Sequence, residues 1–569
     1  MRRGIRLKVN KQDLLTIILL SGIFFTIAIW HLGYTQVPLT NWEIDDSSDF
    51  FVDLGKIERV GTVYFLVKNT SNKTQIQVYT GDPGNWVFGG TIEIKVSYYS
   101  WTDGLTLDED SQYIGFKVDG EFSEVMEIAE LAILDSANQK MEINSIDSEN
   151  SSSINLDYLI DEQNLVQVPA TYMGETFFDE IYFVRTAENY LKLQHPYEWT
   201  HPPLGKLIMA SGIGIFGFNP FGWRIMGVIF ATLMIPLIYF IGKILFQTWI
   251  GGFTAALLLT FDFMHFTLAR IATVDTYVIF FSIASQLFFL IYLKKLLSHG
   301  WKNTPTRPLF FAFLFFALGF STKWIAIYSL AAQIAILFMI RLKEVLKLKE
   351  SNLSDKINVF LEYPYAKIVE FLLIAVIVYF LTYIPDILSG RTILDVFGLQ
   401  GGMYNYHSTL NATHSFSSAW WSWPLILKPV WLYVSYLPLS VNSTIVLLGN
   451  PAVWWVGFSL VILATIRGAR KKSFRGAFIG AFFFVHWIPY MLISRITFLY
   501  HFYINVPILC LASAYYLSKY WKTKWGKIIG IIYFSAVVIL FGYFYAIISG
   551  TSAPVSWINN LKWLPGWSF

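Results

Sequence analysis

The chain has 569 residues, of which 55% are hydrophobic and only 14% are charged, and its mean hydropathy is +0.49. Such values are typical of polytopic membrane proteins and argue against a large soluble enzyme. The single cysteine, Cys510, excludes a disulfide framework and a thiolate zinc site, and no nucleic-acid partner is expected.

The first apolar run, residues 13–34, follows a basic N-terminus that contains Arg2, Arg3, Arg6, Lys8 and Lys11. A signal peptide is the alternative, but the apolar part is about 20 residues long and no small-x-small cleavage pattern follows it. Residues 1–34 are therefore predicted to be a cytoplasmic tail and a retained transmembrane helix.

Residues 35–172 are predicted to form a separate extracytoplasmic β-sandwich. Short alternating stretches such as TVYFLVKN, TQIQVYTG and QYIGFKVDG are separated by Asn, Asp and Gly, and none could span a bilayer. IGFKV followed by EIAELAILDSANQKMEI resembles the end of a discoidin-type jelly roll, a fold often used to bind sugars. Trp86 and Trp101 are predicted either to fill the core or to stack on a sugar. Asp108-Glu109-Asp110 is interpreted as a solvated turn.

An acidic pair, Asp179 and Glu180, stands where this polar domain ends and the membrane-embedded half, residues 173–569, begins. A helix-like run and a rigid His201-Pro202-Pro203 turn follow the pair. A carboxylate at the boundary between water and bilayer is suited to act as a base on a lipid-linked substrate. Asp179 and Glu180 are therefore the candidate catalytic residues.

Ten further apolar segments follow, each near the length that crosses about 30 Å of hydrocarbon. They are residues 222–243, 247–268, 272–293, 308–322, 324–341, 367–388, 450–467, 475–494, 497–518 and 527–549. With the first anchor they predict eleven transmembrane helices. From a cytoplasmic N-terminus, the basic clusters at 294–307, 341–349, 467–475 and 519–527 all fall inside, as Lys and Arg do in membrane proteins. The β-domain, the acidic pair and the 389–440 loop then lie outside.

Polar side chains recur near the outer ends of these segments, where burial in hydrocarbon is costly unless they are paired or functional. They are Arg224, Arg270, Asp275, Lys323, Arg495 and His501. Cations around an acidic pair would stabilise a departing phosphate while the base stays anionic. We therefore interpret this set, with His201 and Lys206, as binding the donor phosphate or the substrate. The alternative is that Arg270 pairs with Asp275 and that Lys323 and Arg495 reach lipid headgroups.

The 389–440 loop is rich in aromatic residues, including Trp420, Trp421, Trp423 and Trp431. These rings are predicted to lie in the headgroup region as an interfacial anchor, or to line the donor or acceptor groove with His407. The interval between His407 and His414 suits a metal poorly, and no cluster of ligands has metal spacing.

Several motifs, in this order, resemble those of the protein O-mannosyltransferase family. They are FDEIYFVRTAENYL, THPPLGKLIMASG, FGWRIMG, LARIATVDTYVIFF, STKWIAIY, SSAWWSWPLILKPVWLY and ITFLYHFYINVPIL. The resemblance covers roughly residues 1–34 and 175–549. It implies a GT-C fold of eleven spans, an extracytoplasmic active site and a polyprenyl-phosphate-linked mannose donor.

The resemblance further implies an inverting transfer of a hexose to Ser or Thr hydroxyls of secreted or membrane proteins, with Asp179 as the base and Glu180 in a supporting role. No cofactor beyond the lipid donor and no obligatory metal are expected. The 389–449 loop is too short for the MIR domain of eukaryotic members, which implies a prokaryotic type in the plasma membrane. The β-domain is not a general feature of the family, so the acceptor stays open, as does the oligomeric state.

Two other functions compete with this interpretation. The first is the same donor chemistry on a glycan or lipid acceptor, as in aminoarabinose or arabinose transferases. The second is a transporter, which is disfavoured because the ionisable groups gather at one face and no inverted repeat is visible.

Overall fold

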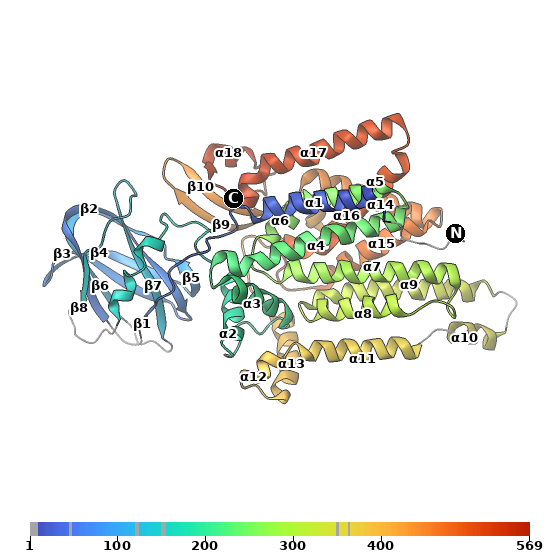
Figure 1. Cartoon of the computed structure of the whole chain (residues 1–569), viewed down its shortest axis with the longest axis horizontal. Coiled ribbons are helices and arrows are strands. Elements are labelled where there is room, and N and C mark those ends of the chain that lie inside the picture. The colour runs from blue at the N-terminus through green and yellow to red at the C-terminus, as the bar shows by residue number, and fades with distance from the viewer. Residues whose placement is uncertain (1–8, 45–47, 120–124, 149–154, 349–351, 362–364) are drawn as a thin grey trace.

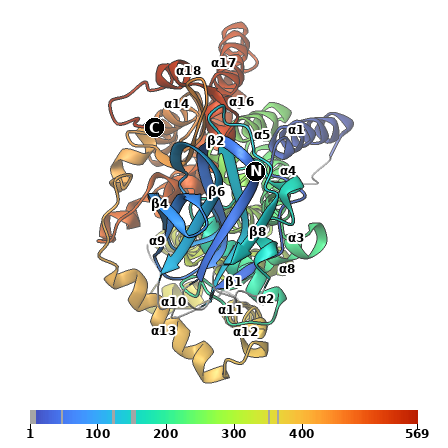
Figure 2. The same cartoon turned by 90° about the vertical axis from the view of Figure 1, so that its left-hand side faces the viewer.

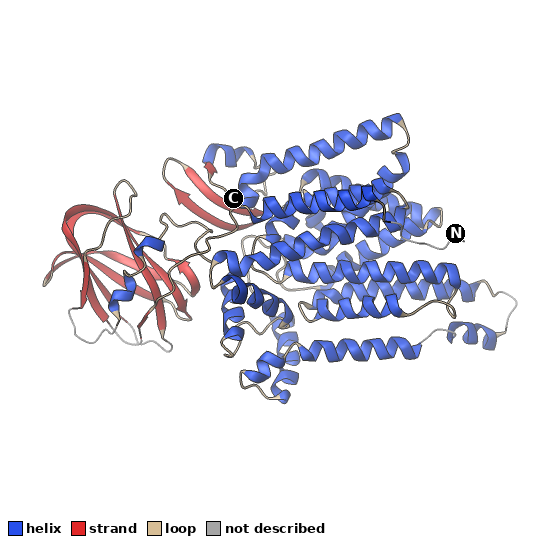
Figure 3. Cartoon of the chain, viewed as in Figure 1, coloured by secondary structure: helices blue, strands red, loops and turns tan. Residues whose placement is uncertain are grey.

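The computed structural model describes residues 9–44, 48–119, 125–148, 155–348, 352–361 and 365–569. The basic residues Arg2, Arg3, Arg6, Lys8 and Lys349 lie outside the described residues. Strands gather at one end of the molecule and helices at the other (Figure 1, Figure 3). The composition change at the end of the first apolar run thus coincides with a change of architecture.

The first helix, α1 (Lys11–Ile29), begins with a capping box in which the side chains and backbone N–H groups of Asn10 and Asp13 bind each other reciprocally. Asp13 is fully buried, accepts a 2.5 Å hydrogen bond from the Tyr239 hydroxyl and forms an ion pair with Lys243, so it fixes α1 on α4. Apolar side chains cover the exposed face of α1, among them Leu14, Leu15, Ile18 and Leu19. A helix with this face is suited to contact lipid.

The β-domain follows and contains eight strands. They are β1 (Trp42–Ile44), β2 (Ser48–Thr70), β3 (Thr74–Asp82), β4 (Asn85–Ile94), β5 (Ser97–Trp101), β6 (Leu105–Asp119), β7 (Met126–Asp135) and β8 (Ser145–Ser148). The order β1-β7-β2-β6-β3-β4 forms one hydrogen-bonded sheet, with β5 and β8 also paired to β2. All eight described strands are thus hydrogen-bonded into one sheet, because the 23-residue β2 pairs with four other strands.

The core of the β-domain is apolar and centres on Trp42, Phe50, Phe65 and Phe116. Neither tryptophan singled out from the sequence belongs to it: Trp86 and Trp101 are half-buried. The Asp108-Glu109-Asp110 triplet is exposed but lies within β6, so the prediction of a turn is wrong; Asp108 there forms an ion pair with Arg59 of β2.

The helical part comprises seventeen described helices after α1. They are α2 (Glu180–Leu191), α3 (Leu204–Phe216), α4 (Pro220–Phe246), α5 (Trp249–Thr260), α6 (Phe263–Ala269), α7 (Asp275–His299), α8 (Arg307–Phe320), α9 (Ile327–Leu346), α10 (Leu353–Leu361), α11 (Tyr365–Leu381), α12 (Ile384–Leu388), α13 (Ile393–Thr409), α14 (Pro451–Arg470), α15 (Phe474–Trp487), α16 (Val506–Tyr520), α17 (Lys524–Ser549) and α18 (Val555–Asn560). A small sheet of β9 (Val430–Leu437), β10 (Val441–Leu447) and β11 (Ala553–Pro554) joins the end of the long loop to the C-terminal segment.

Every segment predicted to cross the membrane is largely helical, but the count of eleven crossings is not confirmed. Among the described residues, seven helices are long and apolar enough to cross, or eight if a bent pair counts as one span. That pair is α5 and α6, which meet at 58° within residues 247–268, the segment predicted as one span. The bend arises because Asp262 caps α6 through the backbone N–H of His265.

The β-domain and the N-terminus of α1 lie at opposite ends of the helical bundle (Figure 1). The C-terminal end of α9, which carries Arg341, Lys343 and the C-cap residue Lys347, also lies far from the β-domain, as does α10. On the β-domain side, α12 lies next to α2, where the Tyr190 hydroxyl donates a 3.0 Å hydrogen bond to Asp386 (Figure 2). The start of the long loop therefore lies beside the C-terminal end of α2.

Candidate active site

The acidic pair opens α2, and its two carboxyl groups have different surroundings. Asp179 is the N-cap residue and Glu180 is the first helical residue. Phe178, immediately before them, has a φ of 53°, a left-handed conformation that is strained for an aromatic residue. Such strained backbone is found where a functional group has to be held in one orientation.

Glu180 is fully buried and serves the structure. Its carboxylate accepts 2.7 Å bonds from both Nε and a terminal nitrogen of Arg224, a fork-like pair in a dry environment. It also accepts the backbone N–H of Ala272 at 2.8 Å and that of Phe177 at 3.3 Å. Glu180 thereby ties the start of α2 to α4 and to the loop before α7.

Asp179 is only partly buried, and its carboxylate makes no hydrogen bond or ion pair with any residue that the structure describes. Burial raises the pKa of Asp179 to about 7. The positive charge of Lys323 lowers this pKa, but the negative charges of Asp275 and Glu198 raise it again. A carboxylate that is free, desolvated and titrates near neutral pH has the properties of a general base.

Lys323 and Asp275 form an ion pair beside this carboxylate. The Lys323 ammonium lies 2.9 and 3.1 Å from the two oxygens of Asp275 at the start of α7. The same ammonium is 5.7 Å from the ring centre of Tyr500, which also packs edge-on against Phe178 at 6.2 Å. Tyr500 thus connects the cation to the strained residue before Asp179.

Arg495 also lies near the Tyr500 ring. It is half-buried and makes no side-chain hydrogen bond or ion pair within the described part of the chain. Its charge acts on Tyr500 and His501, and the His501 ring stacks on Tyr500 at 4.7 Å and on Trp423 at 6.0 Å. Arg495 is therefore available for an anionic ligand.

The turn before α3 is organised by Glu198, a residue that the sequence reasoning missed. Glu198 is buried and accepts bonds from Lys206 at 2.6 Å and from His201 at 3.0 Å. Although burial alone would raise the pKa of Glu198, Lys206 and His201 hold it well below the ordinary value. In the sequence, the only indication of a role for Glu198 is its position between Pro196 and the His201-Pro202-Pro203 turn. The His201 ring faces the His407 ring at 5.3 Å.

Three predicted phosphate-binding cations already bind several partners among the described residues. Arg224 donates its remaining bonds to the carbonyls of Leu32, Tyr172 and Glu175. Arg270 binds the carbonyls at the end of α1 and that of Ser549, together with the Tyr172 hydroxyl. Lys206 uses its three N–H groups on Glu198 and the His201 carbonyl. The structure thus gives these side chains structural roles, and the predicted Arg270–Asp275 pair is wrong, since Asp275 binds Lys323.

The tryptophans of the long loop do not share one surface. Trp423 is fully buried and Trp420 and Trp431 are half-buried, whereas Trp421 is 56% exposed. Trp431 donates to the Thr444 hydroxyl at 2.7 Å. A continuous interfacial face of all four rings is therefore wrong, and Trp423 instead supports His501.

A cleft of about 440 Å³ separates the β-domain from the helical part next to Asp179. The β-domain contributes Val96 and Trp101, the segment before α2 contributes Thr176 and Phe178, and β9 contributes Tyr433. Glu175 at its base accepts a 2.7 Å bond from the Tyr433 hydroxyl. The cleft therefore gives access from the β-domain side to the residues next to the free carboxylate.

Two long regions match family descriptions. Residues 200–354 match "Dolichyl-phosphate-mannose-protein mannosyltransferase", and residues 392–567 match "C-terminal four TMM region of protein-O-mannosyltransferase". The "Polyprenol-phosphate-mannose--protein mannosyltransferase" of Mycobacterium tuberculosis is 23% identical over 424 residues, which are 64% of this chain and 80% of that protein. The protein of the same name from Corynebacterium glutamicum is 24% identical over 430 residues, 64% and 81% of the two chains.

The fold is also similar to that of a solved structure. A chain of the S. cerevisiae protein O-mannosyltransferase Pmt1-Pmt2 complex bound to the sugar donor superposes with a TM-score of 0.57 at 14% identity, covering 69% of this chain and 89% of that chain. This likeness confirms the predicted GT-C fold. The two matched regions carry the His-Pro-Pro turn, Lys323, Arg495 and His501, and this chain therefore belongs to the protein O-mannosyltransferase family.

Proposed function

We propose that the chain transfers mannose from a polyprenyl-phosphate donor to Ser or Thr hydroxyls of exported proteins, with inversion at the anomeric carbon. The observation that carries this proposal is the Asp179 carboxylate, which has no partner among the described residues and lies within reach of the charge of Lys323. Arg495 acts on Tyr500, the same ring on which Asp179 acts. The names of the sequence relatives support the donor and the protein acceptor. They do not favour a glycan or lipid acceptor.

In the proposed reaction, Asp179 accepts the proton of the acceptor hydroxyl as its oxygen attacks the anomeric carbon. The bond between that carbon and the phosphate oxygen breaks, and the lipid phosphate leaves with the electron pair. General base catalysis of this kind contributes about 10²- to 10⁴-fold. A single displacement inverts the configuration at the carbon.

The departing phosphate needs positive charge, and Arg495 and Lys323 are the cations placed to supply it. Arg495 makes no side-chain hydrogen bond with the described residues, so its donors can bind phosphate oxygens, and a guanidinium binds phosphate through two parallel bonds. Asp275 holds Lys323 in position through their ion pair. With both cations in place, we propose that the transfer needs no obligatory metal.

His201 and His501 complete the proposed donor site. The Nδ1 atom of His201 faces Glu198, which orients the ring and leaves Nε2 for a sugar or phosphate oxygen. The Nδ1 atom of His501 lies 3.0 Å from the Phe498 carbonyl, and the ring is held between Trp423 and Tyr500. Both imidazoles are therefore oriented by groups behind them.

The cleft beside the β-domain is proposed as the path of the acceptor chain. Its walls come from the β-domain and from β9, and Phe178 and Ile181, which flank the acidic pair in the sequence, also line it. We further propose that this end of the molecule is extracytoplasmic, because the basic loops lead into the opposite end.

The test is transfer of labelled mannose from polyprenyl-phosphate mannose to a Ser/Thr-rich peptide, with the full chain in membranes. Asp179→Asn should lower transfer by about 10²-fold or more, because Asn keeps the shape and loses the basicity. Asp147→Asn, the same exchange on the exposed side of β8, is the matched control and should transfer normally. Full transfer by Asp179→Asn would refute the assignment of the base.

A further inference from the structure

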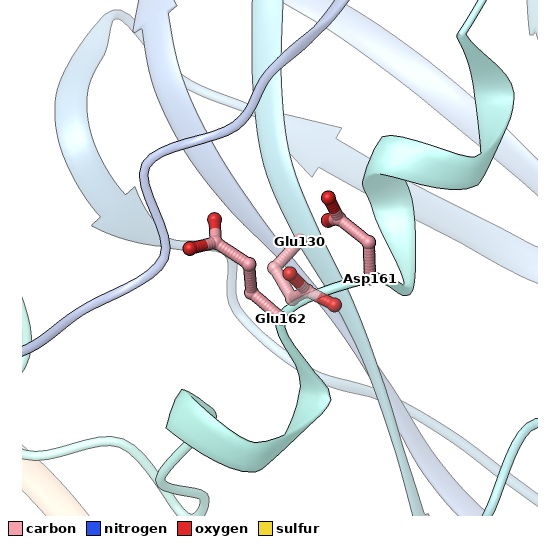
Figure 4. Close-up of side chains that lie close together, drawn as sticks. All are labelled: Glu130, Asp161 and Glu162. Carbon is pink, nitrogen blue, oxygen red and sulfur yellow. The ribbon is translucent and has the colours of Figure 1, made fainter.

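Three carboxyl groups gather on the β-domain, away from the acidic pair of α2. Glu130 belongs to β7, and Asp161 and Glu162 lie in the turn between two short 3-10 helices, residues 156–159 and 163–165 (Figure 4). One oxygen of each lies within 4.8 Å of the others. No Lys, Arg or His forms an ion pair with any of them in the described part of the chain. Three such groups with no counter-charge repel one another strongly.

Glu130 supplies a second, independent observation. Its side chain is 0% exposed, and while Oε1 accepts a 2.8 Å bond from Gln163, Oε2 is buried with no partner in the described residues. Burial, reinforced by Asp161 and Glu162, raises the pKa of Glu130 to about 8. A buried oxygen without a partner costs free energy unless a ligand satisfies it.

The other two carboxyl groups are fixed by the linker that connects α1 to β1. One oxygen of Glu162 accepts the backbone N–H groups of Leu39 and Thr40 at 2.5 and 2.8 Å. One oxygen of Asp161 accepts the Thr40 hydroxyl at 2.9 Å. The second oxygen of each group has no hydrogen-bond partner among the described residues, and Asp161 is exposed, so the cluster is open to solvent.

We propose that Glu130, Asp161 and Glu162 bind a Ca²⁺ ion. All three ligands are oxygens, which suits a hard cation and not zinc or copper. With Ca²⁺–oxygen distances of about 2.3–2.6 Å, two ligands of one ion lie at most about 5 Å apart, and the observed limit of 4.8 Å satisfies this. Mg²⁺, with distances of about 2.1 Å, demands a tighter octahedron and retains its waters.

The bound ion would join three separate segments of the chain. They are strand β7, the turn at 161–162 and, through the bonds of Glu162 and Asp161, the linker at 39–40. Tyr99 reinforces the same junction, because its hydroxyl donates a 2.6 Å bond to the Pro38 carbonyl. The ion would therefore stiffen the attachment of the β-domain to the helical part.

Thermal unfolding of the full-length protein in detergent, with millimolar Ca²⁺ or with EDTA, tests the proposal. Ca²⁺ should raise the Tm of the β-domain by about 5 °C, since a ligand that binds only the folded state stabilises it. Glu130→Gln should abolish the rise, whereas Asp110→Asn, on the exposed face of β6, should keep it. If Glu130→Gln does not fold, the exposed Asp161→Asn takes its place.

Terbium luminescence gives a second readout. Tyr99 lies close enough to Glu130 and Glu162 to feel their charges, so bound Tb³⁺ should emit when tyrosine is excited. Ca²⁺ should displace it with a midpoint of about 10⁻⁴–10⁻³ M, and Mg²⁺ only at higher concentration. Absence of both the Tm rise and displaceable emission would overturn the proposal, as would an unchanged response in Glu130→Gln. Equal midpoints for Mg²⁺ and Ca²⁺ would overturn the assignment to Ca²⁺.

Discussion

The adjacent carboxyl groups of Asp179 and Glu180 should respond to the same chemical change in opposite ways. In Glu180→Gln, an –NH₂ group replaces one of two oxygens, each of which already accepts an N–H of Arg224 at 2.7 Å. Either orientation of the amide places a donor against a donor and leaves the buried guanidinium without its counter-charge. Breaking one partner of a buried ion pair costs about 3–5 kcal/mol.

That cost is a large part of the roughly 5–15 kcal/mol that stabilises a typical protein. We therefore expect Glu180→Gln to lower the Tm clearly and to reduce the yield of monodisperse protein in detergent. Asp179→Asn removes no hydrogen bond within the described residues, so its Tm should stay within a degree or two of wild type, as for surface changes worth about 0.5 kcal/mol or less.

Thermal unfolding and mannose transfer, measured on the same preparations, distinguish the two roles. Glu43→Gln, on the exposed side of β1, is the matched control for the Glu-to-Gln exchange. A Glu180→Gln protein with the Tm of wild type and no transfer would refute the structural role of Glu180. An Asp179→Asn protein with a strongly lowered Tm would refute the idea that Asp179 is free.

Three other predictions follow from the same site. Arg495→Ala should raise the KM for the lipid donor by about ten- to a hundredfold, because a charge-assisted contact of about 1.5–3 kcal/mol is lost. Arg470→Ala, at the C-terminal end of α14, should leave this KM unchanged. Equal KM values in both variants would contradict a role of Arg495 in phosphate binding. The pKa of Asp179 is raised to about 7, and only the ionised carboxylate can accept a proton. The value of kcat/KM should therefore rise about tenfold per pH unit below pH 7 and level off above it. A flat profile from about pH 5 to 9 would argue against Asp179 as the base. Val96→Trp should obstruct the cleft and weaken transfer of mannose to protein acceptors, while transfer to a short peptide should not change. Val87→Trp, on the exposed face of β4, should change neither transfer rate. Loss of transfer to both acceptors in Val96→Trp would place the defect outside the acceptor path.

The helices and strands of this chain can be predicted from its sequence more directly than the partners of its charged side chains can. Apolar length and basic loops predict where helices lie, because these features act locally. The bend between α5 and α6 could not be predicted from these local features. Asp262 looks like a lone polar residue in an apolar run, and only the fold shows that it also accepts from Trp454 at 2.8 Å.

The roles of the cations depend on partners that are remote in the sequence. Arg224 and Arg495 look equivalent when each stands in an aromatic, apolar context. Arg224 donates to the carbonyls of Leu32, Tyr172 and Glu175, so its donors are used. Arg495 donates to no carbonyl within the part of the chain that the structure describes. Sequence patterns give the residue type at each position but not the carbonyls that tertiary packing brings to it.

The division of labour within the acidic pair has a geometric reason. Successive residues of a helix point about 100° apart, so two carboxylates at its start cannot both face the core. Glu180 faces inward and is fixed by Arg224 and two backbone N–H groups, which fixes the first turn of α2. That anchoring keeps Phe178 in its left-handed conformation and holds Asp179 beside Lys323 without a bond of its own. An acid in one position alone would be either buried and unreactive or reactive and poorly oriented, so the proposed mechanism uses both carboxylates.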